Sequence, residues 1–212
     1  MPKPLAHPLS HRFDEALDVA ADIHRRQGRK GTQVPYLAHI LGVTSIALEY
    51  GADEDEAIGA LLHDAVEDAP EELGADAVRK LIQLRFGQRV LKIVEACTDA
   101  DATPKPPWRQ RKSAYVSAIP HKDASSLLVG TADKIYNVSA ILRDFRNEGN
   151  AVFDRFNPEA GRDGTLWYYG ELARSIPARA RELGDERVER LATELSRVVR
   201  TLCVEAEATE DH

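Results

Sequence analysis

Cysteine, methionine and aromatic residues are scarce in this chain of 212 residues, which has two cysteines, one methionine and 6% Phe, Trp and Tyr. Cys97 and Cys203 lie far apart in apolar helical patterns, which argues against a disulfide framework or a cysteine-type zinc site. No apolar run approaches the roughly 18 residues of a membrane span, and the first residues lack the apolar core of a signal peptide. We therefore expect a cytoplasmic protein.

Basic residues are also fewer than acidic ones, with 28 Lys and Arg against 35 Asp and Glu, which gives a formal net charge of −7. This balance argues against a general nucleic-acid surface, although local basic clusters can still hold a phosphorylated small molecule. The length and the 43% hydrophobic content suit one globular domain. We predict a single domain over residues 1–212 that binds neither nucleic acid nor membrane, and the oligomeric state stays open.

Apolar residues recur at helical spacing along most of the chain, which predicts an all-α fold. Ser10 is placed to cap the first helix, and Asp53 with Glu56 forms a capping-box-like start for the third. The expected helices cover about 10–28, 35–51, 53–70, 75–86, 88–97, 125–146, 166–172 and 185–204. We expect a loop at 98–107, a mobile loop at 147–164 and a frayed tail at 205–212. The C-terminal helices occupy about 163–205.

The third predicted helix carries four groups that can bind a metal or move protons, namely His63, Asp64, Glu67 and Asp68. Residues four apart share one face of a helix, so two polar rows lie side by side. Apolar neighbours place this face beside the core, where a buried charge needs a partner. A solvated polar helix end is the simpler interpretation unless other segments supply further ligands.

Two other predicted helices carry one polar residue each within an apolar stripe. Alone, His39 would be a satisfied core histidine, and Asp133 would be half of a buried ion pair, for example with Lys134. If the helices pack together, His39 and Asp133 join His63 and Asp64 in a set of two imidazoles and two carboxylates. Such a set suits Mn²⁺, Fe²⁺ or Mg²⁺ better than a closed structural zinc. Glu67 or Asp68 would then orient a water molecule or carry its proton.

Two short basic segments are candidates for phosphate binding. Arg29 and Lys30 lie in a loop where they could grip phosphate oxygens, or form a solvated turn. Arg109, Arg111 and Lys112 follow an aromatic residue, an arrangement that can stack on a base and bind phosphate, although a solvated helix start is the simpler interpretation.

The order of these motifs resembles a known family. Arg29-Lys30, the segment from Pro35 to His39, the segment from Leu61 to Asp68 and the segment from Ala132 to Asn137 are similar to successive motifs of the HD superfamily. The specific resemblance, over about Phe13 to Arg146, is to the hydrolase domain of the RelA/SpoT-type alarmone enzymes and their small stand-alone relatives. It implies an all-helical HD-domain bundle and Mn²⁺-dependent removal of the 3′-pyrophosphate from guanosine tetra- or pentaphosphate.

The resemblance also implies roles for individual residues. By the match, the metal ligands are His39, His63, Asp64 and Asp133. Glu67 and Asp68 correspond to the acidic pair that the family uses in hydrolysis. Positions that contact the nucleotide correspond to Arg29, Lys30 and Asn137.

Two positions depart from the family pattern. Gly130 replaces a common lysine and Ser139 replaces a frequent arginine, and both changes remove positive charge near a phosphate-rich substrate. Two alternatives therefore stay open: an HD phosphohydrolase acting on another nucleotide, and a non-catalytic module that senses a nucleotide or neutralises a partner protein. The complete set of candidate ligands favours an enzyme.

Overall fold

The computed structural model describes residues 8–99, 104–155 and 160–209. All regular elements in these ranges are helical, and the nearest approach to a strand is an isolated bridge between Gly28 and Pro35, so the all-α prediction is confirmed. The elements are α1 (His11–Ile23), α2 (Leu37–Glu49), α3 (Glu54–Leu62), α4 (Ala75–Phe86), α5 (Gln88–Cys97), α6 (Trp108–Ala118), the 3₁₀ turn η1 (Ile119–His121), α7 (Ala124–Glu148), α8 (Ala151–Asp154), α9 (Gly161–Leu183) and α10 (Glu186–Ala208). Within these ranges, no helix combines the length and the apolar character that crossing a membrane would need.

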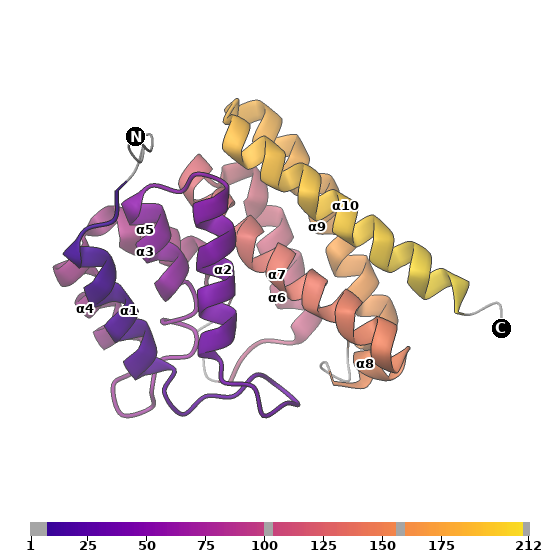
Figure 1. Cartoon of the computed structure of the whole chain (residues 1–212), viewed down its shortest axis with the longest axis horizontal. Helices are drawn as coiled ribbons and strands as arrows, with labels where there is room; N and C mark the ends of the chain where they lie inside the picture. The colour runs from indigo at the N-terminus through magenta and orange to yellow at the C-terminus, as the bar shows by residue number, and fades with distance from the viewer. Residues whose placement is uncertain (1–7, 100–103, 156–159, 210–212) are drawn as a thin grey trace, which may run out of the picture.

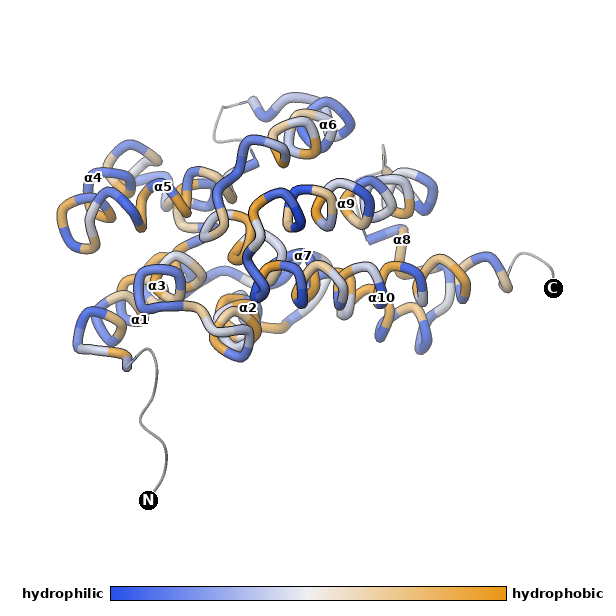
Figure 2. Tube along the Cα trace, turned by 90° about the horizontal axis from the view of Figure 1, so that it is seen from above, coloured by the Kyte–Doolittle hydropathy of each residue, from blue (hydrophilic) through white to orange (hydrophobic). Residues whose placement is uncertain are grey.

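The long helix α7 runs through the middle of the molecule and contacts both halves (Figure 1). One core joins α7 to α9, α10 and part of α2, and the other joins α1, α3, α4 and α5. Seen from above, α2 and α10 lie on one side of α7 and α6 and α9 on the other, and hydropathy alternates along each helix as expected for amphipathic helices (Figure 2). The ends of α2 and α3 therefore meet the middle of α7 where the two cores adjoin.

The caps of the first and third helices form as expected. The backbone N–H of Arg12 donates to the Ser10 hydroxyl, and Asp53 and Glu56 form a reciprocal capping box at the start of α3. However, α3 ends at Leu62 and not near Pro70, so the prediction of a helix through Asp68 is wrong. The reason is local: His63 Nδ1 lies 2.8 Å from the Ala60 carbonyl oxygen, and the chain tightens into turns over residues 63–68.

Other predicted boundaries also need correction. Helix α1 stops at Ile23, well before Gly28, because residues 24–36 turn back on themselves through the bridge to Pro35. The predicted loop at 147–164 contains the end of α7, all of α8 and the start of α9, while residues 156–159 lie outside the described part. Helix α10 extends to Ala208 and covers the first half of the predicted tail, of which residues 210–212 are not described.

A buried carboxylate ties the N-terminal half to the C-terminal helices. Glu56 in α3 is fully buried, and its carboxylate lies 2.7 Å from Arg187 Nη1 on α10 and accepts a hydrogen bond of 2.8 Å from the Ser125 hydroxyl. A buried charge without its partner is costly. This pair therefore holds α10 against α3.

Arg187→Ala is expected to lower the free energy of unfolding by about 2–3 kcal/mol, because Glu56 would keep only weaker partners in the core. Urea unfolding followed by circular dichroism measures this change. Arg197→Ala is the matched control on the same helix, since Arg197 pairs with Glu194 on the surface and should cost less than about 0.5 kcal/mol. Equal losses for the two variants would contradict the role given to Arg187.

Candidate metal centre and substrate cavity

Three side chains from α2 and the end of α3 converge on one point. The Nε2 atoms of His39 and His63 are 3.1 Å apart, and Asp64 Oδ2 lies 3.3 Å from the first and 3.0 Å from the second. The two imidazoles are about 99% buried. The tight turn after α3 causes the convergence, because it directs the consecutive residues His63 and Asp64 into the same site.

Asp133 on α7 completes the set that the sequence predicts. Its Oδ1 lies 3.4 Å from His39 Nε2 and 3.8 Å from His63 Nε2. The same carboxylate accepts hydrogen bonds of 2.5 Å each from Lys134 Nζ and Asn137 Nδ2. Asp133 thus lies beside both imidazoles and is also the partner of a buried lysine.

The chemistry of these donors fits a divalent metal ion. The contact between His63 Nδ1 and a backbone carbonyl fixes the N–H on that side of the ring and turns the Nε2 lone pair toward the cluster. A cation between the two facing imidazole nitrogens would be bound by both rings and balanced in charge by the two carboxylates. Neighbouring ligands at about 2.1 Å from a metal lie about 3 Å apart, and the separations between these donor atoms are 3.0–3.8 Å. This His and Asp group implies a divalent metal site.

Tyr36 supports the cluster from the turn before α2. Its hydroxyl donates to Asp64 Oδ2 at 2.5 Å, and its ring lies edge-on to His39, with centroids 5.2 Å apart. Burial and the nearby carboxylates of Asp64 and Asp68 raise the pKa of Tyr36 far above its usual range, so the phenol stays a neutral donor. Tyr36 therefore orients one ligand and packs against another.

The two acidic residues after the cluster have different surroundings. Asp68 accepts a 2.8 Å hydrogen bond from the Gln27 amide, and burial raises the pKa of Asp68. Glu67 points toward the loop before α6, where it accepts from Lys105 Nζ at 2.8 Å and from the Asp99 backbone N–H at 3.2 Å. Asp68 is thus suited to hold a proton, whereas both oxygens of Glu67 are engaged in this conformation.

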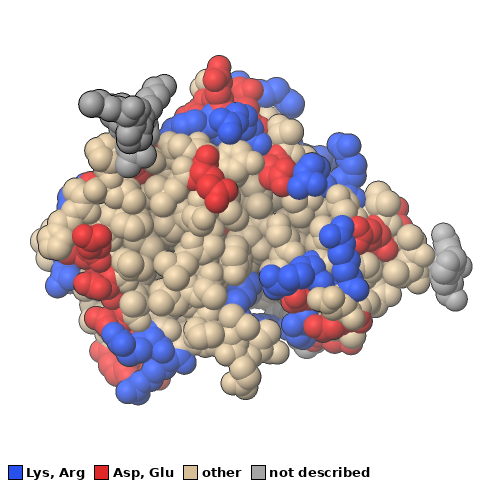
Figure 3. Space-filling view, viewed as in Figure 1, with Lys and Arg blue, Asp and Glu red and all other residues tan. Residues whose placement is uncertain are grey.

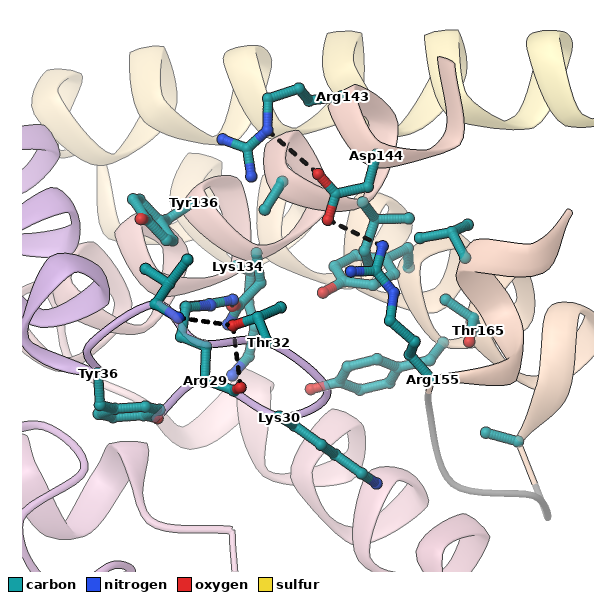
Figure 4. A pocket seen from close by; sticks show the side chains of 18 of the residues that line it. Arg29, Lys30, Thr32, Tyr36, Lys134, Tyr136, Arg143, Asp144, Arg155 and Thr165 are labelled. Carbon is teal, nitrogen blue, oxygen red and sulfur yellow. Dashed lines mark hydrogen bonds and ion pairs between the residues drawn. The ribbon is translucent and has the colours of Figure 1, made fainter. Parts of the chain in front are cut away.

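A cavity of about 580 Å³ opens beside the cluster between the loop after α1 and helices α7, α8 and α9 (Figure 4). It is lined by aromatic and basic side chains, among them Tyr136 and the buried Tyr168. The Tyr168 hydroxyl has no hydrogen-bond partner among the described residues although it is buried. Basic side chains gather around a hollow on the face of Figure 3, in contrast to the acidic chain as a whole. The cationic lining residues are Arg29, Lys30, Lys112, Lys134, Arg143 and Arg155.

The three predicted nucleotide-binding residues all line this cavity. Arg29 Nη2 donates to Asn137 Oδ1 at 3.0 Å, and the Arg29 guanidinium lies 5.3 Å from the centre of the Tyr136 ring. Because Asn137 also donates to Asp133, one chain of hydrogen bonds connects the basic loop to the metal cluster. Lys30 reaches the cavity from the same loop.

Of the second basic segment, Arg109 to Lys112, a single basic residue lines the cavity. Lys112 lines the cavity and binds Asp99 at 2.8 Å, whereas Arg111 pairs with Asp99 and Arg109 stacks on the Trp167 ring at 3.2 Å. Sequence reasoning missed Arg143 and Arg155 as cavity residues. The only available signal was their basic character near a predicted loop, which is a common feature of surfaces.

The two departures from the family pattern lie outside the cavity lining. A Cβ on Gly130 would come within 2.9 Å of the Tyr115 hydroxyl, and Ser139 is absent from the lining residues. Positive charge reaches the cavity from other positions, namely Lys112, Lys134, Arg143 and Arg155. The loss of charge at residues 130 and 139 therefore leaves a basic cavity.

Comparison with known proteins identifies a matching family and similar enzymes. Residues 16–166 match the HD domain family. The guanosine-3′,5′-bis(diphosphate) 3′-pyrophosphohydrolase MESH1 of Xenopus tropicalis is 39% identical over 132 residues, which cover 61% of this chain and 69% of that protein. MESH1 of Homo sapiens is 34% identical over 165 residues, which cover 76% and 80% of the two chains.

A solved structure extends the similarity to the C-terminal helices. It is a metazoan ortholog of SpoT, described as hydrolysing ppGpp, and it aligns with a TM-score of 0.67 at 26% identity. The alignment covers 91% of this chain and 97% of the other. The similarity in three dimensions thus reaches beyond the segment that carries the motifs.

Proposed function

Because the chain belongs to the HD domain family, we propose that it is a metal-dependent phosphohydrolase that removes the 3′-pyrophosphate from guanosine tetra- or pentaphosphate. The observation that carries this proposal is the hydrogen-bonded path from Arg29 through Asn137 to Asp133. This path supports the proposal because it connects an arginine of the cavity lining to the cluster of His and Asp side chains beside the cavity. In a phosphorylated nucleotide, the phosphate that reacts is likewise separated from the rest of the molecule.

The metal ligands in this proposal are His39, His63, Asp64 and Asp133, and the metal is Mn²⁺. Mixed nitrogen and oxygen donors with positions left for water are compatible with Mn²⁺. When bound, such a metal polarises a phosphoryl oxygen and makes water a stronger nucleophile near neutral pH. Tyr36 keeps Asp64 oriented through its 2.5 Å hydrogen bond.

The acidic pair has two separate tasks in this proposal. Asp68 takes the proton from the attacking water on the carboxylate oxygen that Gln27 leaves free. Glu67 keeps the loop before α6 in place through Lys105 and Asp99, which fixes one wall around the reacting groups. Asn137 and Arg29 bind and orient the nucleotide.

Product identification tests the proposed function. Guanosine tetraphosphate is incubated with the Mn²⁺-loaded protein, and the products are separated by ion-exchange chromatography. Release of GDP together with pyrophosphate is the expected result. Bound metal with no turnover of guanosine tetraphosphate would favour another nucleotide substrate, and a protein that binds neither Mn²⁺ nor another divalent ion would favour a non-catalytic module.

Arg29→Ala is expected to raise KM about tenfold with little change in kcat, because it removes binding that the ground state and the transition state share. Steady-state kinetics on guanosine tetraphosphate measures both constants. Arg25→Ala, at an exposed arginine shortly before the loop, is the control, since Arg25 pairs with the exposed Asp22. A fall in kcat with unchanged KM would contradict the binding role of Arg29.

A further inference from the structure

Two arginines at the far end of the cavity meet on one carboxylate. Arg143 on α7 and Arg155 directly after α8 both line the cavity, and Figure 4 shows them on either side of Asp144. Asp144 Oδ1 accepts from Arg143 Nε at 3.2 Å, and Asp144 Oδ2 accepts from Arg155 Nη2 at 3.0 Å. One acidic residue therefore gathers two guanidiniums at the cavity wall.

This pair lies far from the metal cluster along α7. Asp133, Asn137 and Asp144 follow one another at helical spacing, so they share one face of the helix. The rise of 1.5 Å per residue places Asp144 about 16 Å beyond Asp133 along the axis. Asn137, which contacts Asp133, thus lines one part of the cavity, and Arg143 and Arg155 line a part further along α7.

Arg155 is held in place before any ligand binds. Its aliphatic stem covers Gly31 in the basic loop, where an added Cβ would lie 3.2 Å from Arg155 Cδ. The side chain is only 25% exposed, and its guanidinium also lies 3.4 Å from Glu148. A guanidinium positioned in this way loses little conformational freedom when it binds an anion.

The three cations around Arg155 outnumber the acids. Asp144 and Glu148 pair with Arg143 and Arg155, while Lys30, next to the Gly31 that Arg155 covers, forms no ion pair with an acid among the described residues. Guanidiniums bind phosphate oxygens through two parallel hydrogen bonds. A diphosphate can therefore take over contacts that Asp144 makes in the free protein.

We propose that Arg155, together with Arg143 and Lys30, forms a subsite for the 5′-diphosphate of the nucleotide, and that Arg155 makes the enzyme selective for substrates phosphorylated at both ends. This inference rests on the proposed function, because the metal cluster must receive the 3′-pyrophosphate for the 5′ end to reach the arginines. Ser139 stands where the family often has an arginine, and in this proposal Arg143, four residues later, supplies a guanidinium in its place.

The test uses three substrates that share the 3′-diphosphate and carry two, one or no phosphates at the 5′ position of guanosine. For the unmodified protein, kcat/KM should fall as the 5′ phosphates are removed. Arg155→Gln should lower kcat/KM about tenfold for the substrate with the 5′-diphosphate and leave it unchanged for the substrate without 5′ phosphates. Arg143→Gln should show the same dependence on the substrate.

Arg146→Gln is the matched control, since Arg146 is on α7 but pairs with Glu205 away from the cavity. It should leave all three values unchanged, and circular dichroism verifies that each variant is folded. An equal loss by Arg155→Gln on all three substrates, or no loss on any, would overturn the subsite.

If the unmodified protein hydrolyses none of the three, the proposed function fails and the subsite is judged by binding alone. Calorimetry on the metal-free protein then compares GDP with guanosine. A preference for GDP that disappears in Arg155→Gln supports the subsite. Equal affinities for GDP and guanosine in the unmodified protein overturn it.

Discussion

Asp64→Ala is expected to remove bound metal and to lower kcat on guanosine tetraphosphate by at least about a thousandfold. Asp64 Oδ2 lies within 3.3 Å of both imidazole nitrogens, so its loss removes a central donor of the cluster. Metal catalysis is worth several kcal/mol of barrier, and each 1.4 kcal/mol is a factor of ten in rate. His63→Ala should have the same effect.

Elemental analysis of the purified variants and steady-state kinetics on the same samples measure the two effects together. Asp76→Ala is a suitable control, because Asp76 is an exposed acid on α4 that pairs with the neighbouring Arg79. It should keep both the metal and the rate. An Asp64→Ala protein that retains stoichiometric metal would show that the ligand set is wrong.

Asp68→Asn and Glu67→Gln are expected to keep the metal and to lower kcat, in each case without changing the shape of the side chain. Asp68→Asn removes the group that takes the proton and should reduce kcat by about 10²–10⁴-fold. Glu67→Gln removes the charge that binds Lys105. It should reduce kcat because the loop before α6 is then no longer held in place. Metal content and kcat are measured for each variant.

Lys105→Met separates the two tasks, because it breaks the same contact with Glu67 from the other side. If Glu67 acts by holding the loop, Lys105→Met and Glu67→Gln should reduce kcat to a similar extent. Full activity of Glu67→Gln would show that neither proton transfer nor loop positioning depends on this residue. Full activity of Asp68→Asn would show that the proton goes elsewhere.

Helices were predictable wherever local signals decide their limits. The capping box at Asp53 and Glu56 begins α3, and Gly87 separates α4 from α5, as the sequence indicates. The end of α3 was not predictable, because it depends on a contact between the His63 ring and the Ala60 carbonyl that no propensity describes. That early end is what turns His63 and Asp64 into the site.

The metal cluster was predictable in composition, since four polar residues interrupt the apolar patterns of three helices. For Asp133, the two interpretations open at the level of sequence are compatible: it pairs with Lys134 and also faces the imidazoles. The residues on the far side of the cavity were not predictable from the sequence, because Arg155 reaches the cavity only through the packing of α8 against α7 and α9. A segment predicted as a loop could not indicate where its basic residue would point.

Titrating the metal-free protein with Mn²⁺, while following release of GDP and pyrophosphate from guanosine tetraphosphate, shows whether the cluster of His and Asp side chains is a catalytic metal site. His39, His63 and Asp64 converge on one point with Asp133 beside them, so activity should rise in proportion to added metal and level off at one ion per chain. The Asp64→Ala protein should stay inactive throughout. Full activity of the metal-free protein, or no activity at any Mn²⁺ concentration, would show that the cluster is not a catalytic Mn²⁺ site.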